Sequence, residues 1–203
     1  MFYGEKARGS DSAMTSHIER TSHPKNADES RTHLNRTLIE YPEGVEDRTA
    51  AIQHRLEHAG LKRKIGSNQV RAIRINLSGS PEDMARIEAT GQLDAWCADS
   101  LQYLFDTFGR ENIVSAHLHM DEKTPHIHAT LVPIVQAART RRKKEDQVKR
   151  HYRKKSADAP RLCAGDIMTR GKLKSYQDGY AKAMSHHGLQ RGIDGSEARH
   201  IST

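Results

Sequence analysis

The sequence contains little cysteine and no long apolar run. Its 203 residues include only two cysteines, Cys97 and Cys163, which lie far apart and form no CxxC pair. This pattern excludes a disulfide framework and a thiolate zinc site, and it fits a reducing compartment. No apolar run approaches the roughly 20 residues that a membrane helix needs, and the N-terminal residues MFYGEKARGS lack the apolar stretch of a signal peptide. We therefore expect a cytoplasmic protein without a membrane segment.

The charge balance is basic. Thirty-three Lys and Arg residues face 26 Asp and Glu residues, which gives a net charge of +7. This balance favours a polyanionic partner, above all a nucleic acid. We expect one domain over residues 1–203, as the N-terminal part of a longer protein, because the sequence stops at SEARHIST without a closing helix. The most basic stretch, residues 139–161, lacks an apolar stripe and is expected to form a mobile excursion.

Hydrophobic spacing predicts an alternation of helices and strands. Helical spacing is found in VEDRTAAIQHRLEHAG, which Gly60 can end, in the segment from Ser80 to Gly109, which Gly91 can divide, and in RGKLKSYQDGYAKAMSHHG near the end. Period-two alternation predicts strands in QVRAIRINLSGS, NIVSAHLHM and PHIHATLVPI, although the buried face of the first is ambiguous. Residues 1–31 are polar, and SHPKNADES within them is typical of a loop.

Two of these strands carry a concentration of histidines. The segment HMDEKTPHIH at 119–128 holds three histidines and two acids around a short turn. Because successive side chains of a strand point to opposite faces, the apolar residues of both strands share one face and the histidines share the other. That polar face gathers His117, His119, His126 and His128, close enough across a hairpin to share one ion. Three imidazoles with open positions suit a catalytic divalent cation.

The same ten residues resemble the H-x-D-E-x-x-P-H-x-H metal motif of the Mob/Pre-type (MobV) plasmid mobilisation relaxases, a branch of the HUH endonucleases. HIER at 17–20 resembles the family's H-N-x-R box, and SRTHLN at 30–35 resembles its R-x-H-L-N box. The likeness continues through VRAIR at 70–74, GLQRG at 188–192 and SEARH at 196–200. It covers almost the whole chain and implies an HUH-type α+β fold, in which a mostly antiparallel sheet of about five strands carries flanking helices.

The resemblance implies a set of catalytic residues. His119, His126 and His128 would bind the metal, with Glu122 as a nearby carboxylate and Mn²⁺ or Mg²⁺ as the ion. The first-box histidine, His17, would be the nucleophile. The implied activity is that of a relaxase, which nicks one strand of an origin of transfer and keeps a covalent 5′-phosphate adduct on the histidine for conjugative mobilisation. Two features depart from the family: Ile18 replaces the asparagine of the first box, and the first strand, MFYGEKARG, is short and poorly patterned.

Roles for further site residues follow from their chemistry and from the resemblance. Arg20 is a candidate phosphate clamp, because its planar guanidinium matches phosphate oxygens. Either Glu19 or Glu122 is expected to orient the attacking ring. The expected partners are single-stranded or hairpin origin-of-transfer DNA and, through a region beyond this sequence, a coupling protein or other transfer machinery. The residues expected to contact DNA are Asn35, Arg71, Arg74, Arg141, Arg142, Lys143 and Lys144.

Several alternatives remain open at this point. His23 and His33 rival His17 as the nucleophile, and His33 is expected to support the site from a strand. Tyr176 and Tyr180 lie one helical turn apart, as do the nucleophilic tyrosines of HUH replication initiators and some transposases, although both rings also fit a core. A non-catalytic DNA-binding module would use a further ligand such as His117 to close a structural metal site. A hydrolase of small phosphoesters is disfavoured by the basic charge.

Overall fold

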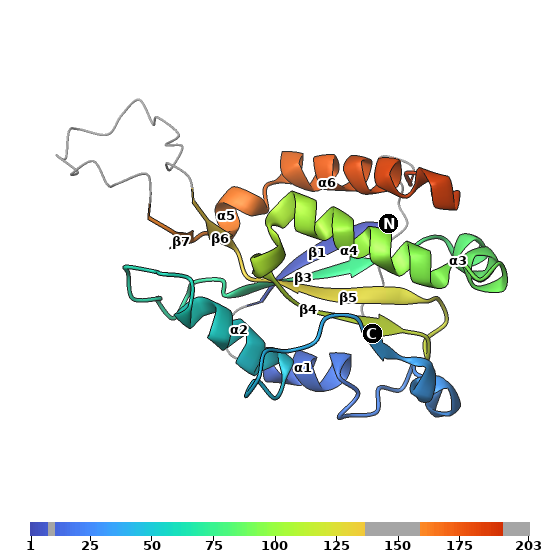
Figure 1. Ribbon diagram of the computed structural model, residues 1–203, viewed down its shortest axis with the longest axis horizontal. Helices are drawn as coiled ribbons and strands as arrows, with labels where there is room; N and C mark the ends of the chain where they lie inside the picture. The colour runs from blue at the N-terminus through green and yellow to red at the C-terminus, as the bar shows by residue number, and fades with distance from the viewer. Residues whose placement is uncertain (8–10, 137–158, 193–203) are drawn as a thin grey trace.

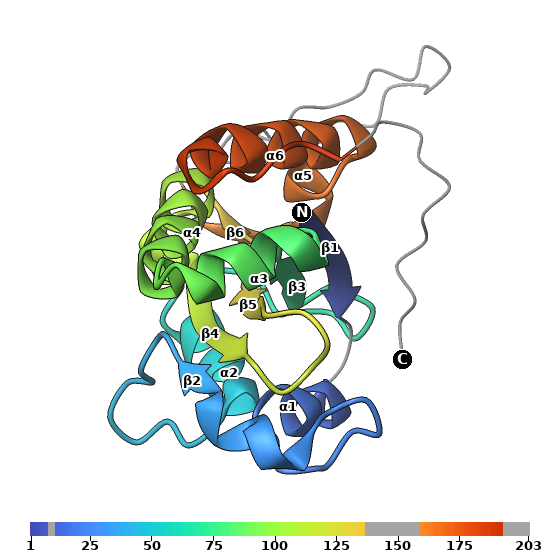
Figure 2. The same cartoon turned by 90° about the vertical axis from the view of Figure 1, so that its right-hand side faces the viewer.

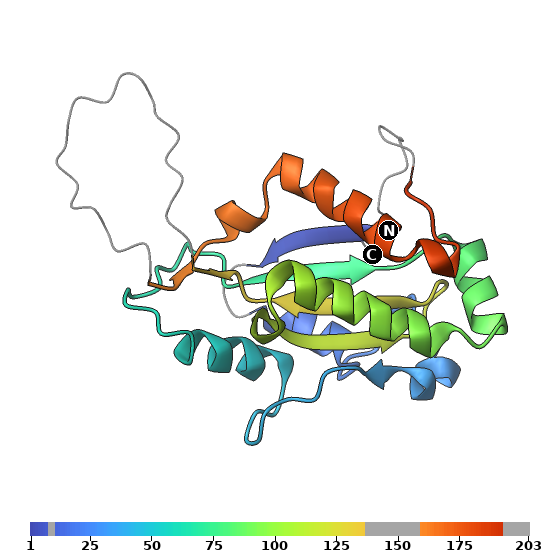
Figure 3. The ribbon, with the colours of Figure 1, turned by 45° about the horizontal axis from the view of Figure 1, so that its top comes forward.

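The fold is built on a five-stranded antiparallel sheet. The structure is a computed structural model that describes residues 1–7, 11–136 and 159–192. Within these residues the strand order is β1-β3-β5-β4-β2, and Figure 3 shows β1 and β3 lying side by side. The strands are β1 (Phe2–Ala7), β2 (Arg36–Thr37), β3 (Ala72–Leu77), β4 (Ile113–His119) and β5 (His126–Leu131). A second, two-stranded sheet joins β6 (Ile134–Val135) to β7 (Arg161–Leu162).

Helices cover both faces of the five-stranded sheet, which confirms the predicted α+β class (Figures 1 and 2). One face packs against α3 (Pro81–Ala89), α4 (Leu93–Phe108) and α6 (Arg170–Ala183), and the other against α1 (Ser12–Ile18) and α2 (Arg48–Glu57). The shorter elements are α5 (Ala164–Ile167) and the 3-10 helices η1 (Glu29–Leu34), η2 (Arg110–Asn112) and η3 (Ser185–His187). Every helix in the described residues is too short or too polar to cross a bilayer.

The main core lies under α4 and α6. It shows which face of β3 is buried, which the sequence leaves ambiguous. Ile73, Ile75 and Leu77 of β3 are fully buried in this core, so they share a face with the apolar side of the β4–β5 hairpin. Arg74 and Asn76 of β3 therefore lie on the opposite face, which also carries the histidines. The sheet thus separates an apolar layer from a polar one.

Local signals set most helix boundaries as predicted. Ser80 caps α3, and its hydroxyl accepts a hydrogen bond from the Asp83 amide at 3.1 Å. Gly91, at φ +69°, ends α3 and separates it from α4. The helix expected from residue 45 begins later, at Arg48, because the Asp47 carboxylate accepts from the Ala50 amide at 2.6 Å and caps α2.

The N-terminal segment is more structured than the sequence suggests. The poorly patterned first strand forms as β1 and pairs with β3 from Phe2↔Leu77 to Ala7↔Ala72. Ser12–Ile18 form α1, for which the sequence gives no helix signal, and the loop expected over residues 22–30 ends early because Glu29–Leu34 form η1. The loop prediction holds for residues 22–28. The assigned DNA contacts Arg141, Arg142, Lys143 and Lys144, and all but the last three residues of the predicted excursion over 139–161, lie outside the described residues.

Candidate functional site

Three histidines converge on the polar face of the β4–β5 hairpin, as the alternation predicts. His119 and His126 are direct cross-strand partners, and His128 is the next polar residue of β5. The ring centroids of His126 and His128 lie 4.7 Å apart, and those of His119 and His128 lie 4.8 Å apart. One ligand atom from each ring falls within 4.8 Å of the others. This spacing lets the three side chains bind a single ion.

Hydrogen bonds fix the orientation of His126. Its Nδ1 lies 2.9 Å from the Thr124 carbonyl oxygen, which can only accept, so Nδ1 carries the proton. The unprotonated Nε2 then points at His128 Nε2, 3.1 Å away. Burial lowers the pKa of both rings, most strongly that of His128, and so favours their neutral form. Two ligand nitrogens are therefore directed at one point before any ion binds.

His119 is held differently, because both of its ring nitrogens have protein partners. Arg20 Nη2 lies 2.9 Å from Nδ1, and a guanidinium can only donate, so Nδ1 accepts. Nε2 then carries the proton and donates it to the Ile18 carbonyl oxygen at 2.8 Å. His119 thus joins β4 to the end of α1, and it must release one of these two contacts to bind an ion.

A buried ion-pair network lies beside the histidines. Arg20 donates to both carboxylate oxygens of Asp121 at 2.8 Å and to Glu122 Oε1 at 2.7 Å. The Asp121 side chain is fully buried and also accepts from Asn35 Nδ2 at 2.7 Å. Burial opposes ionisation of Asp121, but the hydrogen bonds from Arg20 and Asn35 outweigh it and hold its pKa well below the usual range. The network therefore stays charged at neutral pH.

Glu122 occupies the centre of the site. Its Oε1 lies 3.9 Å from His17 Nε2, 3.9 Å from His126 Nε2 and 3.8 Å from His119 Nδ1. Burial raises the pKa of Glu122, but interactions with His119, His126 and Arg20 outweigh burial and lower it to about 2. An ionised carboxylate thus faces the metal-candidate histidines on one side and His17 on the other.

His17 lies in the last turn of α1 and faces this cluster. Its ring centroid is 5.9 Å from that of His128, and its side chain is 26% exposed, so the ring is open to a ligand on one side. A pocket of about 390 Å³ beside it is lined by His17, Pro24, Lys25 and Asn26. Burial, followed by the positive charge of Arg20, lowers the pKa of the ring and favours the neutral imidazole.

The two rival histidines do not reach the site. His23 is exposed in the loop after α1 and lies 3.8 Å from Glu29. The expectation that His33 supports the site from a strand is wrong, because His33 is exposed on η1. Of the three candidates, only His17 faces the hairpin histidines.

Glu19 is bound to other partners, whereas Glu122 is the carboxylate that lies near His17. Glu19 Oε1 accepts from the Tyr41 hydroxyl at 2.6 Å and from the Arg48 amide at 2.7 Å. The Tyr41 hydroxyl also lies 3.1 Å from His117 Nε2, so the fourth histidine of the hairpin is bound to Tyr41 and stays out of the cluster. This contact disfavours His117 as a ligand that closes a structural metal site.

Sequence reasoning missed Tyr41 and Arg48. Arg48 is fully buried and donates to Thr130 Oγ1 at 2.7 Å, to Thr15 Oγ1 at 3.1 Å and to Asp11 at 2.8 Å. It therefore fastens α1 and α2 to β5. No local signal marks either residue, since Tyr41 precedes a proline in an unpatterned segment and a helical arginine is usually exposed.

Two of the expected ligand-binding residues have internal partners instead. Arg20, the expected phosphate clamp, is only 7% exposed, and all three of its guanidinium nitrogens are hydrogen-bonded within the protein. Asn35, an expected DNA contact, accepts from the Met120 amide at 2.7 Å and donates to Asp121. Both side chains shape the β4–β5 turn, and their polar atoms are engaged within the protein.

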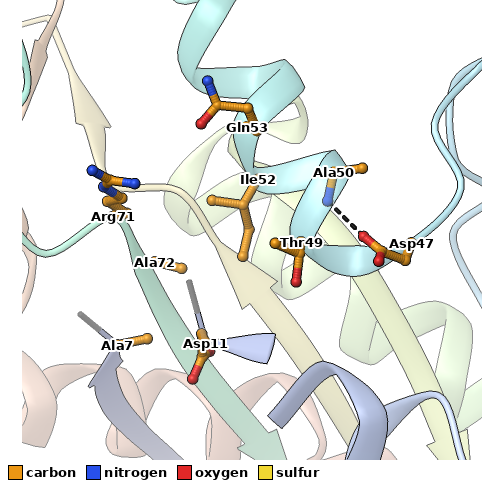
Figure 4. Close-up of a pocket in the computed structure, with 9 residues that line it drawn as sticks. All are labelled: Ala7, Asp11, Asp47, Thr49, Ala50, Ile52, Gln53, Arg71 and Ala72. Atoms are coloured by element: carbon orange, nitrogen blue, oxygen red, sulfur yellow. Dashed lines mark hydrogen bonds between the residues drawn. The ribbon is translucent and has the colours of Figure 1, made fainter. Parts of the chain in front are cut away.

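The arginine pair near β3 is partly buried. Arg74 lies 2.8 Å from Glu5 and 3.8 Å from Asp11, which leaves it less free than a surface arginine. Arg71 lines a second pocket of about 390 Å³, between the N-terminal half of α2 and the start of β3 (Figure 4). Asp11 and Asp47 also line this pocket, so its charge is mixed.

The two tyrosines of α6 lie far from the histidines. Tyr180 is 2% exposed, and its hydroxyl is hydrogen-bonded to Trp96 Nε1 at 3.2 Å and to Ser100 at 3.0 Å. The Tyr176 hydroxyl donates to the Ile167 carbonyl oxygen at 3.1 Å. Helix α6 covers the opposite face of the sheet (Figure 2). Both rings are therefore core residues, which disfavours the replication-initiator interpretation.

Comparisons with known proteins agree with this arrangement. A family model described as "plasmid recombination enzyme" (Mob/Pre) matches residues 5–203. A 65 kDa protein of Zymomonas mobilis is 30% identical over 202 residues, which cover 98% of this chain and 30% of that protein. A plasmid recombination enzyme of Bacillus thuringiensis is 31% identical over 144 residues, which cover 70% of this chain and 27% of that protein. The chain thus spans less than a third of the length of these two relatives.

Among solved structures, a Mn-bound MobM relaxase domain in complex with plasmid oriT DNA superposes with a TM-score of 0.77. That match covers 100% of this chain and 95% of the other, at 24% sequence identity. At this identity the match shows that the two chains share a fold.

Proposed function

Because this chain belongs to the Mob/Pre family of plasmid recombination enzymes, we propose that it is a metal-dependent DNA relaxase domain. Its substrate is one strand of an origin of transfer, in single-stranded or hairpin form. It nicks that strand by transesterification and holds the 5′ phosphate on His17, so that the energy of the broken bond is kept for religation. The biological outcome is conjugative mobilisation of a plasmid or other mobile element.

The observation that carries this proposal is the position of His17. It reaches the hairpin histidines from a helix about a hundred residues away in sequence, and Glu122 Oε1 lies 3.9 Å from both His17 Nε2 and His126 Nε2. A structural metal site does not need a partly exposed histidine beside it. A nucleophile held beside a cluster of metal ligands and a carboxylate suits the transfer of a phosphoryl group to that nucleophile.

The side chains present fit a divalent metal ion. Two imidazole nitrogens already point at one another at 3.1 Å, and a third histidine and an ionised carboxylate lie beside them. We propose that His119, His126 and His128 hold the ion, with Mn²⁺ preferred to Mg²⁺ because imidazole suits the transition metal better. When bound, the ion neutralises charge on the scissile phosphate.

The nucleophilic step follows from the chemistry of His17. The neutral ring attacks phosphorus with a nitrogen lone pair, an N–P bond forms, and the P–O3′ bond breaks. The 3′ oxygen leaves with the electron pair of that bond and takes up a proton from solvent water. The ring becomes positively charged, and the Glu122 carboxylate 3.9 Å from Nε2 stabilises that charge. A lysine at this position would be mostly protonated at neutral pH and could not attack.

Arg20 and Asn35 act as positioning residues in this scheme. Arg20 holds Asp121, Glu122 and His119 in one network, and Asn35 fixes both Asp121 and the backbone at Met120. They set the turn between the two histidine strands. Neither is expected to contact the phosphate directly.

The DNA path is assigned from charge and exposure. Lys25 lines the pocket beside His17, and its ammonium group is a candidate for a phosphate contact. Arg71, Arg74 and the basic run Arg141, Arg142, Lys143 and Lys144 remain proposed contacts farther along the strand. A coupling protein or other transfer machinery is a further proposed partner.

The covalent bond itself provides the test. A phosphoramidate is acid-labile, because protonation of the nitrogen makes it a good leaving group, whereas a tyrosyl phosphodiester survives mild acid. We expect the adduct trapped with a suicide oligonucleotide to fall apart on brief acid treatment, as followed on denaturing gels. It should vanish in His17→Ala and persist in the exposed-histidine control His23→Ala.

A double variant, Tyr176→Phe with Tyr180→Phe, keeps both rings for packing and removes their hydroxyls. We expect this variant to form the adduct. An acid-stable adduct that disappears only in the double variant would overturn the assignment of His17 and favour a replication initiator.

A further inference from the structure

A second cluster of ligand-type side chains lies on the opposite face of the sheet from His17. His186 and His187, the last two residues of η3, both direct Nε2 at the same atom, Asp99 Oδ2 of α4, at 2.8 Å each. The three ligand atoms lie within 4.8 Å of one another, and the two ring centroids are 4.1 Å apart. None of these residues takes part in the proposed relaxase chemistry.

The fold holds this cluster in place from several directions. His187 is 4% exposed, and its carbonyl oxygen accepts a hydrogen bond from Arg86 of α3 at 2.9 Å. Gly188 follows at φ +77°, where a Cβ would lie 2.6 Å from Arg86 Nη2, so the tight turn requires glycine. Met184 and Leu189, on either side of η3, are buried in the main core. The ligand backbone is therefore fixed without an ion.

The chemistry of the three side chains suits a transition metal. His186 and Asp99 are 59% and 44% exposed, so an ion from solvent can reach the cluster and water can complete its coordination. Two imidazoles and one carboxylate form a common ligand set for Zn²⁺ with an open position.

The distances allow an ion to replace the two hydrogen bonds. A tetrahedral ion with bonds of about 2.1 Å spaces its ligand atoms about 3.4 Å apart. The present N–O separations of 2.8 Å would therefore have to widen by about 0.6 Å. The exposed ring of His186 and the carboxylate torsion of Asp99 can supply this movement, while His187 stays fixed.

We propose that Asp99, His186 and His187 bind a second divalent transition metal ion of the Zn²⁺ class. The ion joins η3, which follows α6, to the middle of α4, two elements 87 residues apart in sequence. Its role is to fasten the end of α6 over the core. The proposal rests on the geometry of this face alone and is independent of the relaxase assignment.

Metal stoichiometry and thermal unfolding test this site directly. With Zn²⁺ or the spectroscopic probe Co²⁺ titrated into the metal-free chain, we expect two tight equivalents for the wild type and one for His186→Ala. His186 is exposed, so this replacement should not unfold the protein. We further expect Zn²⁺ to raise the melting temperature less in His186→Ala than in the wild type.

The matched control is His58→Ala. His58 is exposed and stacks on His54 with ring centroids 4.1 Å apart, but neither ring belongs to a group of metal-binding geometry in the described residues. This variant should keep both equivalents. His126→Ala should also lose one equivalent, and combining it with His186→Ala should lose both.

Three results would overturn the second site. The wild type could bind a single tight equivalent that His126→Ala removes and His186→Ala leaves in place, which would show that the Asp99 cluster binds no ion. A second equivalent could persist in His186→Ala with its affinity reduced less than about tenfold, which is below the loss expected even for a residue that only supports a ligand. Binding that is weak and equally reduced in His58→Ala would indicate adventitious surface binding.

Discussion

Replacement of Arg20 by alanine should destabilise the protein strongly. The Arg20 side chain is 7% exposed, Asp121 is fully buried, and two 2.8 Å hydrogen bonds join them. Removal of one partner leaves an uncompensated buried charge, which typically costs about 3–5 kcal/mol. The exposed pair of Arg31 and Glu88, 3.6 Å apart and more than 40% exposed on both sides, should contribute less than about 1 kcal/mol. Arg31→Ala is therefore the matched control.

The backbone conformation of Arg20 does not affect the comparison of the wild type with Arg20→Ala. Arg20 has φ +56°, a left-handed conformation that disfavours arginine and alanine alike, so the substitution reports the side chain. The free energies of unfolding would come from urea titrations with unchanged m-values. Arg20→Lys, which keeps the charge but loses the two-pronged geometry, should lie between the two. A loss of less than about 1 kcal/mol in Arg20→Ala would refute the view that this network holds the turn together.

Three further outcomes are expected. His126→Ala should abolish strand cleavage and leave the far-UV circular dichroism unchanged, because an open catalytic site contributes little to folding; global unfolding of this variant would favour a structural metal. The pKa of Asp121 is lower in the folded state than in the unfolded state, where it is about 4. The ionised carboxylate therefore stabilises the fold above about pH 4, and this contribution is lost as the pH falls further. The free energy of unfolding should decrease by at most about 1.4 kcal/mol per pH unit from this group. Urea titrations at pH 5 and pH 3 should show this slope in the wild type, and an equal slope in Asp121→Asn would contradict it. Deletion of residues 141–155, a prediction from sequence charge, should weaken DNA binding at all sequences and flatten its log-log salt dependence by about one per lost phosphate contact; an unchanged salt slope would show that the segment does not contact DNA.

The histidine hairpin could be predicted from sequence because its signals are local. Strict alternation places the side chains on faces, and a short turn between two such segments brings the strands together. The ends of α3 and α4 were equally readable, since Ser80, Gly91 and Gly109 act within one turn of themselves. His17 was different: it came from the resemblance, and its own neighbours gave no sign of a site.

The features that could not be predicted depend on contacts between residues far apart in the sequence. Helix α1 has seven residues and is held by Arg48 and by the contact between His119 and the Ile18 carbonyl, so its own sequence does not specify it. The sequence predicts Arg20 as a phosphate clamp and Asn35 as a DNA contact because it reveals the chemical type of a side chain. It does not reveal that their partner, Asp121, lies about 90 to 100 residues away and is buried.

Because α1 is short, the part of the site that carries His17 should open more often than the strands that carry the other histidines. The hairpin histidines lie on β4 and β5, which have paired strands on both sides, so their amides should exchange with solvent only when the whole sheet unfolds. A seven-residue helix is too short to persist alone, and α1 can open by releasing a few side-chain contacts. His17 therefore belongs to the region of lowest local stability in the site. The candidate nucleophile and the metal-candidate histidines therefore lie on elements of different local stability.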